Sequence, residues 1–312
     1  MVISKEASAP LVVVVGITGK QGGSVVRALK ASDREYRIRG LTRDITKPAA
    51  QVLIAEGVQM VGVSLTADNE EGARNAFQGA DIIFAVTNFN EHFDATRELS
   101  EGKMLVDAAK FVGVKLFIWS GLESFKEFSD GRYPGVTFFE SKAAVSAYAR
   151  RVGIPLAVVV AGFYMTNIFD HFGLKRGPDE VYSFSLPAAP GTLVPFIDVE
   201  ADYGRYVRAA IESPGLGAGA YIRTGGSISF EDIISQAAEV TGKKIVYNQI
   251  SREAYIEPAA NKEIGNLFAN MFEAYEHVGY YGTDKPTSED ILDGALKSWV
   301  DFLKENPPKF PA

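Results

Sequence analysis

The stretch LVVVVGITGKQGGSVVRALK, residues 11–30, constrains the fold more than any other part of the chain. Its first five residues are apolar and mostly β-branched, which is typical of a parallel-sheet strand buried on both faces. Gly16, Gly19 and Gly22 follow at once, and the apolar residues after them recur at helical spacing. A strand, a tight glycine turn and a helix are therefore predicted, in that order.

A helix followed by a strand recurs along the first half of the chain. Residues 47–65, 71–88, 98–122 and 141–163 each show the pattern, and the alternating segment 36–43 supplies a further strand near an edge. This alternation predicts an α/β fold of the Rossmann type, a right-handed, doubly wound parallel sheet. Such a sheet binds its ligands at the carboxyl ends of its strands.

The regular alternation weakens after the segment AGFYMTN. We expect the proline- and glycine-rich stretch 174–192 to leave the sheet as a loop, and residues 194–213 to return through an amphipathic helix. A strand in AYIRTGG follows, and then a helix capped by Ser229 and Asp232 and closed by Gly242. We predict a Rossmann domain over residues 1–163 and about 192–224, and a smaller, discontinuous α+β domain over about 164–191 and 225–312.

The composition excludes several classes of function. The 312 residues carry a formal net charge of −7, and their lysines and arginines are scattered, so no nucleic-acid partner is expected. There is no cysteine, and His92, His171 and His277 lie far apart, so we predict no metal site and expect each histidine to be solvated or structural. The start MVISKEASAP has no apolar run, and no later segment has membrane-spanning length. We therefore expect a cytoplasmic protein without a membrane partner.

The glycine turn has the features of a pyrophosphate site. A strand that ends in glycines and opens a helix leaves backbone N–H groups at the positive end of the helix dipole. Gly16 allows the tight turn, Gly19 the close approach of the phosphate and Gly22 the contact of helix with strand, while Thr18 and Gln21 add hydrogen bonds. The alternative is a turn that binds nothing, but the repeated strand–helix units favour a dinucleotide.

The end of the second strand distinguishes the two nicotinamide cofactors. An acid there would bond the ribose 2′-hydroxyl, whereas this chain has Arg43, with Thr42 and Lys47 nearby. Asp44 follows, but its side chain points the other way if the backbone is still extended. The alternative is an ordinary exposed arginine after a strand. We predict NADP(H) rather than NAD(H).

Several motifs in order support a family resemblance. With GITGKQGGSVVRAL, LTRD, VTNFNE, EGKMLVDAAKFVGVKLFIWSGLES and ESKAAVSAYARRVGIP, the chain resembles the NmrA-like family of atypical short-chain dehydrogenase/reductases, which is related to isoflavone reductase-like enzymes. The resemblance runs from about Val12 to the aromatic tail. It implies a Rossmann domain that binds NADP(H) and a small C-terminal domain that closes over the nicotinamide. Some members are reductases, and others are redox sensors that bind transcription factors.

The resemblance also implies catalytic candidates. In the usual Tyr-x-x-x-Lys pair the lysine would be Lys142, but Phe138 stands in the tyrosine position and has no proton to give. Lys142 then becomes the acid/base candidate, as a buried amine near other cationic charge; the alternative is a surface lysine at a helix start. Ser120 matches the serine that orients a substrate carbonyl, or is a turn serine. Tyr164 could replace the missing proton donor, or pack as an ordinary aromatic residue.

The remaining site residues also come from the resemblance. It implies that Thr87 and Asn88 line the nicotinamide half and that the loop Gly162 to Asn167, including Phe163, lies beside the carboxamide. Val63 and Ser64 replace an acid of the adenine side, so adenine recognition is expected to be looser or displaced. The tail supplies a lid of aromatic residues, unless these belong to the core: Phe268, Phe272, Tyr275, Tyr280 and Tyr281.

Two functions follow from these observations. In the first, the protein is an NADPH-dependent reductase of a small aromatic or apolar metabolite, in which Lys142 assists proton transfer. In the second, it is a redox sensor that binds the cofactor and signals to a protein partner. The missing tyrosine favours the sensor, and the aromatic tail and the retained lysine permit the enzyme; we favour the reductase.

Overall fold

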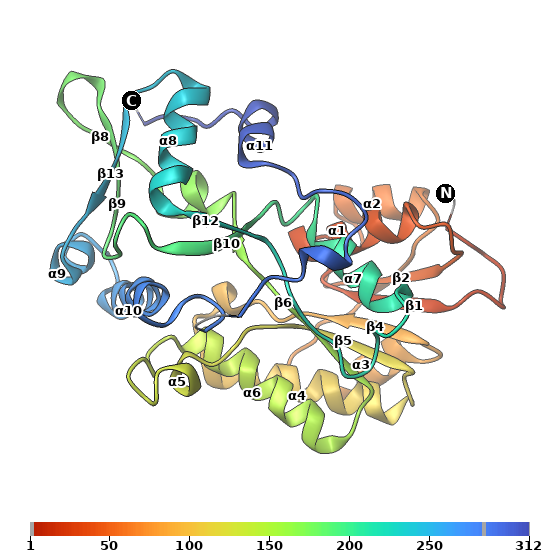
Figure 1. Ribbon diagram of the computed structural model, residues 1–312. Helices are drawn as coiled ribbons and strands as arrows, with labels where there is room; N and C mark the ends of the chain where they lie inside the picture. The colour runs from red at the N-terminus through yellow and green to blue at the C-terminus, as the bar shows by residue number, and fades with distance from the viewer. Residues whose placement is uncertain (1–2, 283–284, 312) are drawn as a thin grey trace.

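The computed structural model describes residues 3–282 and 285–311. Its main sheet has seven parallel strands in the order β11-β6-β5-β4-β1-β2-β3 (Figure 1). The strands are β1 (Leu11–Val15), β2 (Arg37–Thr42), β3 (Gln59–Gly62), β4 (Ile82–Ala85), β5 (Leu116–Gly121), β6 (Leu156–Val160) and β11 (Tyr221–Arg223). Strands β2 and β3 lie on one side of β1, and β4 and the later strands lie on the other. The order in which the chain adds its strands therefore reverses at β1, as in a doubly wound sheet. The predicted α/β Rossmann-type fold is confirmed.

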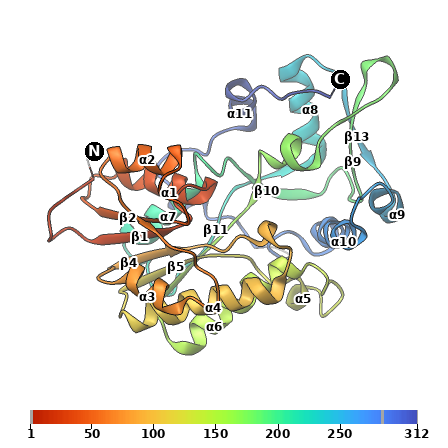
Figure 2. The same cartoon turned by 180° about the vertical axis from the view of Figure 1, so that it is seen from behind.

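Helices cover both faces of this sheet (Figures 1 and 2). One layer holds α1 (Lys20–Lys30), α2 (Pro48–Ala55) and α7 (Tyr203–Glu212), and the other holds α3 (Glu70–Phe77), α4 (Ala95–Phe111) and α6 (Thr137–Val152). Every residue of β1 is buried between the layers, which is why its sequence is continuously apolar. In α7 the helix begins at Tyr203, later than the predicted 194–213, because Leu193–Ile197 form a strand instead.

A smaller part of the molecule is built on two three-stranded sheets. The first has the order β12-β10-β7 and the second β13-β9-β8. Their strands are β7 (Phe163–Tyr164), β8 (Lys175–Arg176), β9 (Tyr182–Leu186), β10 (Leu193–Ile197), β12 (Gly226–Ser229) and β13 (Ile245–Gln249). The prediction of a loop over 174–192 was wrong in this respect, because β8 and β9 lie within it. Residues of β9 alternate between buried and half-buried, as a strand with one face on the core requires.

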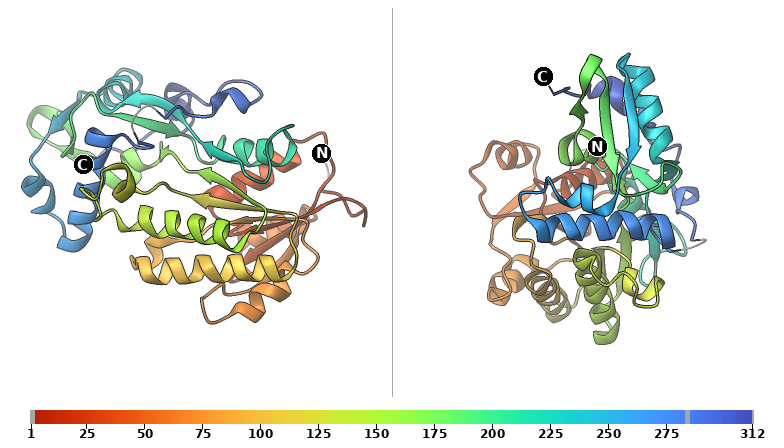
Figure 3. Two further views of the ribbon diagram at one scale, coloured as in Figure 1. Left: turned by 60° about the horizontal axis from the view of Figure 1, so that its bottom comes forward. Right: turned by 90° about the vertical axis from the view of Figure 1, so that its left-hand side faces the viewer.

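The remaining helices are not confined to the smaller part, since one follows β4 and another follows β5. They are η1 (Phe89–Glu91), α5 (Phe125–Phe128), η2 (Ile168–Phe172), η3 (Pro178–Glu180), α8 (Phe230–Thr241), α9 (Arg252–Ile256), α10 (Lys262–Val278), η4 (Glu289–Ile291) and α11 (Trp299–Glu305). The predicted caps of α8 are confirmed: the Ser229 hydroxyl accepts from the Asp232 N–H, and Gly242 ends the helix with φ +65°. Helix α10 lies between the smaller sheets and α5 (Figures 1 and 3).

The predicted domain division stays a prediction. The segment 192–224 supplies α7 and β11 to the Rossmann part but β10 to a smaller sheet. The two parts share one continuous core of buried side chains. In that core the ring of Phe139 in α6 lies 6.3 Å from Tyr275 in α10, and Phe163 lies 6.2 Å from Phe196.

Candidate functional site

A cavity of about 640 Å³ opens at the carboxyl edge of the Rossmann sheet. It runs along the ends of β1, β2, β4, β5 and β6 and ends against α10. All the predicted catalytic residues and the main predicted cofactor-binding residues line this cavity: Gly16, Thr18, Gly19, Gln21, Gly22, Arg43, Thr87, Asn88, Ser120, Lys142, Gly162, Phe163, Tyr164 and Asn167. The structure thus brings these residues together, and their individual roles stay predictions.

The glycine turn has the geometry that a close phosphate approach requires. Gly16 has φ +64°, a conformation that L side chains rarely adopt. A Cβ on Gly22 would lie 2.3 Å from the Gly16 carbonyl oxygen, so this glycine serves the contact of helix with strand. A Cβ on Gly19 would meet only that carbonyl, at 3.2 Å. Gly19 is the N-cap of α1 and has no side chain to occupy the first-turn N–H groups.

Of the two polar atoms of the Gln21 side-chain amide, one has a hydrogen-bond partner among the described residues and the other has none. Its Nε2 donates to the Tyr164 hydroxyl at 2.6 Å, while its Oε1 is buried and has no hydrogen-bond partner among the described residues. Buried amide oxygens are nearly always bonded, so this atom indicates a ligand donor at α1. Burial raises the pKa of Tyr164 to about 12. Because Tyr164 accepts from Gln21, its own proton remains available on the cavity side.

Arg43 is engaged by a residue that sequence reasoning missed. Its guanidinium forms an ion pair with Glu91 of η1. The neighbouring Asp44 carboxylate accepts from the backbone N–H and the hydroxyl of Thr46, at 2.8 and 2.6 Å, which lowers the pKa of Asp44. Asp44 is therefore engaged by Thr46, and the guanidinium of Arg43 is engaged by Glu91.

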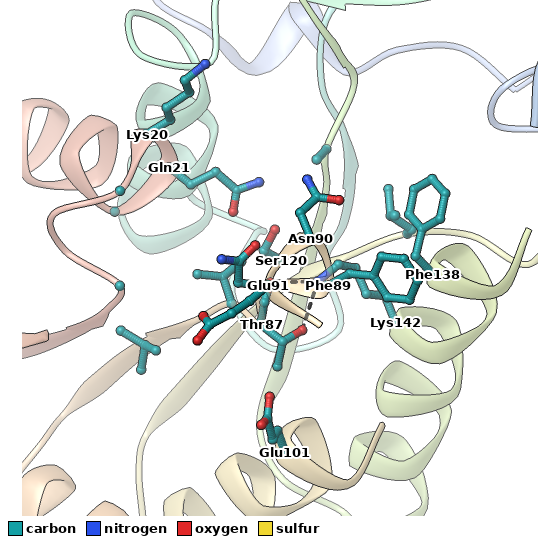
Figure 4. A pocket seen from close by; sticks show the side chains of 18 of the residues that line it. Lys20, Gln21, Thr87, Phe89, Asn90, Glu91, Glu101, Ser120, Phe138 and Lys142 are labelled. Atoms are coloured by element: carbon teal, nitrogen blue, oxygen red, sulfur yellow. Dashed lines mark hydrogen bonds between the residues drawn. The ribbon is translucent and has the colours of Figure 1, made fainter. Parts of the chain in front are cut away.

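Lys142 belongs to a buried polar network. Its Nζ donates to the carbonyl and hydroxyl oxygens of Thr87, at 3.1 and 2.9 Å, and lies 2.9 Å from Oε1 of Glu98. Glu98 is 0% exposed, and its other oxygen accepts from the Ser141 hydroxyl. The Thr87 hydroxyl in turn donates to Glu98 at 2.8 Å. In Figure 4, Lys142 reaches Thr87 from one side of the cavity while the Gln21 amide points inward from the other.

This network corrects the chemical environment that we expected for Lys142. From the sequence we expected other cationic groups near the Lys142 amine. The charged group in contact with it is instead the carboxylate of Glu98. An ammonium has three donors, and three protein oxygens lie around this one. Lys142 is therefore held in place by its neighbours.

Glu98 left one signal in the sequence. It lies on α4 in register with Gly102, Leu105 and Ala109, all of which are buried. A carboxylate on the buried stripe of an amphipathic helix requires a partner, because an unpaired buried charge is very costly. The spacing predicts where the carboxylate points but not that Lys142, on another helix, is its partner.

The far end of the cavity has an aromatic wall. Phe138 in α6 lies 5.4 Å from Phe89 and 6.4 Å from Phe268 of α10, measured between ring centroids. Of the predicted lid residues, Phe268, Tyr275 and Tyr280 line the cavity, and Met271 does so too. Phe272 and Tyr281 are buried in the core instead.

Two adjacent tyrosines fix the C-terminal end of α10 to the Rossmann part. The Tyr280 hydroxyl donates to the carbonyl of Ala161 at 3.0 Å, and the Tyr281 hydroxyl donates to that of Thr224 at 2.7 Å. Both acceptors lie just beyond the ends of sheet strands. Helix α10 is thus tied to the sheet immediately after its last turn.

The other candidates occupy distinct environments. Ser120 is 2% exposed at the end of β5 and lines the cavity, as do Val63 and Ser64 on the predicted adenine side. His92 also lines the cavity; its Nε2 is buried without a hydrogen-bond partner among the described residues and lies 3.7 Å from Glu101. His277 bonds the Tyr133 hydroxyl at 2.7 Å. The side chain of His171 lies outside the described residues.

The helices place one limit on the molecule. Within residues 3–282 and 285–311, none is long and apolar enough to cross a bilayer. In the same ranges, no three His, Asp or Glu side chains are grouped so that they could hold a metal ion.

Comparisons with known proteins assign the family. Residues 8–305 match the NmrA-like family. The NmrA-like family domain-containing oxidoreductase malD of Malbranchea aurantiaca is 31% identical over 326 residues, which cover 94% of this chain and 95% of malD. Two solved structures are similar. NmrA, a negative transcriptional regulator, has a TM-score of 0.73 at 25% identity over 90% of this chain and 84% of NmrA. Triphenylmethane reductase of Citrobacter sp., complexed with NADP(H), has a TM-score of 0.75 at 20% identity over 94% and 99%. With nearly its whole length matched, this chain belongs to the NmrA-like family.

Proposed function

We propose that the protein binds NADP(H) and is an NADPH-dependent reductase of a small aromatic or apolar metabolite. The observation that carries the proposal is the continuity of one cavity from the glycine turn and Arg43 to the aromatic wall. A dinucleotide that follows the strand ends brings its nicotinamide toward the wall formed by Phe138 and Phe268. An apolar substrate fits against such a wall.

The residues present fit the cofactor. The first turn of α1 would hold the pyrophosphate, Arg43 the 2′-phosphate and Lys142 the nicotinamide ribose, with the loop from Gly162 to Asn167 beside the carboxamide. The unsatisfied Oε1 of Gln21 supports a ligand donor at the same place. The solved triphenylmethane reductase complexed with NADP(H) and NmrA in complex with NADP support the same choice.

Bound NADPH would supply a hydride to the substrate, and the chain must then supply a proton. Tyr164 is the better candidate for the proton donor, because its hydroxyl proton is free while Lys142 is surrounded by acceptors. Ser120 would orient the acceptor oxygen or nitrogen of the substrate. Lys142, held by Glu98 and Thr87, would then position the ribose. Solvent returns the proton to Tyr164 after each turnover.

One observation favours a non-catalytic redox sensor instead. Phe138 cannot give a proton, and the ammonium of Lys142 faces Thr87 and Glu98, so the usual pair of the superfamily is absent. NmrA, a negative transcriptional regulator, is a structural relative. The sensor would bind the cofactor without consuming it and would signal to a protein partner.

The decay of NADPH absorbance tests the two functions. With saturating NADPH and a panel of aromatic enones, quinones and imines, we expect substrate-dependent decay that is lost on Tyr164→Phe, by about 10²–10⁴-fold. Because the pKa of Tyr164 is raised, the rate should stay constant through neutral and moderately alkaline pH and fall only as pH approaches that pKa. Saturation separates a catalytic defect from a binding defect.

Each result has a defined meaning. Turnover that Tyr164→Phe leaves unchanged removes Tyr164 from the mechanism. NADPH that binds but is not consumed with any compound of the panel supports the sensor. As a matched control, Tyr148→Phe removes a hydroxyl that bonds Asp107 outside the cavity and should leave turnover unchanged.

A further inference from the structure

The ion pair between Arg43 and Glu91 crosses the mouth of the cofactor groove. Arg43 follows β2, and Glu91 lies in η1, after β4. In the sheet β1 lies between these two strands, and its end carries the glycine turn. Both charged residues line the cavity. A carboxylate of this chain therefore occupies the arginine fork that the proposed function assigns to the 2′-phosphate.

The position of Glu91 is set by its own segment. Phe89, in the same short helix, is 5% exposed and packs against Phe138 at 5.4 Å. The side chain of Glu91 itself is 39% exposed and that of Arg43 is 68% exposed. The backbone of this segment is thus anchored by an aromatic contact, while the carboxylate that pairs with Arg43 is partly exposed to solvent.

A second arginine, Arg97, contributes to the electrostatic surroundings of Glu91. Arg97 also lines the cavity. A hydrogen bond to Glu101 is the main cause that raises the pKa of Arg97, and the charge of Glu91 adds to it. Glu91 thus keeps a longer-range attraction to Arg97 when it leaves Arg43, although Arg97 itself stays bonded to Glu101 at 2.8 Å.

We propose that Glu91 is a specificity-determining residue that weakens the preference for NADPH over NADH by competing for Arg43. This inference rests on the proposed function, because it requires a dinucleotide in the groove. The 2′-phosphate of NADPH must displace the carboxylate from Arg43, whereas NADH has no group that needs the arginine fork. Glu91 acts on one cofactor through Arg43 and leaves the other almost unaffected.

Calorimetric titration of the full chain with NADPH and with NADH tests the proposal. We expect Glu91→Gln to tighten NADPH by about two- to fivefold and to change NADH by less than about 1.5-fold, as an exposed ion pair allows. Glu56→Gln is the matched control: Glu56 pairs with Lys30, its side chain is also 39% exposed, and it does not line the cavity. In an Arg43→Gln background, Glu91→Gln should no longer tighten NADPH.

The possible failures are distinguishable. If NADH and NADPH both bind but Glu91→Gln tightens them equally, or leaves NADPH unchanged, the inference is overturned and the proposed function stands. If its effect on NADPH persists without Arg43, competition for that fork is likewise overturned. If the wild-type chain binds neither cofactor, the proposed function fails and the inference fails with it.

Discussion

Glu98 and Lys142 form an ion pair whose members depend on each other. Glu98 is fully buried, and the side chain of Lys142 is 11% exposed. Burial of two charges is itself costly, so the pair is no proof of added stability. Removal of one partner leaves the other charge without compensation in the interior.

We therefore expect Glu98→Ala to lower the free energy of unfolding by about 3–5 kcal/mol. Lys142→Met, which removes the other partner, should also destabilise, and the double variant Glu98→Ala/Lys142→Met should lose less than the sum of the two. Chemical denaturation measures all three. Glu56→Ala, at an exposed ion pair, is the control and should cost less than about 1 kcal/mol. Additive losses in the double variant would show that the two charges do not interact.

The first strand, turn and helix were predictable because their signals are local. The five apolar residues of β1 and the three spaced glycines need no distant partner to specify a strand, a turn and a helix start. Strand β9 was not predictable in this way. Its alternation is short and lies between glycines and prolines, and it pairs with β13, where Tyr182 lies opposite Ile245. The ion pairs of Glu98 and Glu91 were not predictable for the same reason, because their partners come from other parts of the chain.

Two glycines of the turn should respond differently to substitution. Gly19→Val places a side chain where only the Gly16 carbonyl is near, so the fold should survive while NADPH and NADH binding are both lost. Gly22→Val brings a Cβ within 2.3 Å of backbone, so it should destabilise the fold by about 1–3 kcal/mol or more. Circular dichroism with calorimetric titration separates the two effects. Cofactor binding retained by Gly19→Val would mean that this glycine serves the turn alone.

At the scale of the whole molecule, the Rossmann part and the smaller sheets share both core and cavity. Aromatic rings of α5, α6 and α10 pack together, with Phe125 4.6 Å from Phe139 and 5.8 Å from Tyr275. The predicted site residues could be named without this knowledge, because parallel strands all end at one edge. The sequence could not predict which aromatic residues of the tail reach the cavity. Phe268 and Phe272 lie on the same helix, and only the packing of that helix places Phe268 at the cavity and Phe272 in the core.

The shared core predicts a single cooperative unfolding transition. In scanning calorimetry, we expect one peak with equal calorimetric and van't Hoff enthalpies. NADPH at about 100 times its Kd should stabilise the whole chain by about 2.7 kcal/mol and move the peak without splitting it. Two separate transitions, of which only one responds to NADPH, would instead show that the predicted domains unfold independently.

The hydroxyl bonds of Tyr280 and Tyr281 also bear on how firmly the aromatic wall of the cavity is held in place. They hold the last turn of α10 to the backbone of the Rossmann sheet. Helix α10 is also held nearer its first turns, because Arg252 of α9 donates to Asn266 at 2.9 Å and to Asn270 at 3.0 Å. The aromatic wall to which Phe268 belongs is therefore already formed by the chain's own contacts, so we expect it to select a ligand by shape without first having to be assembled.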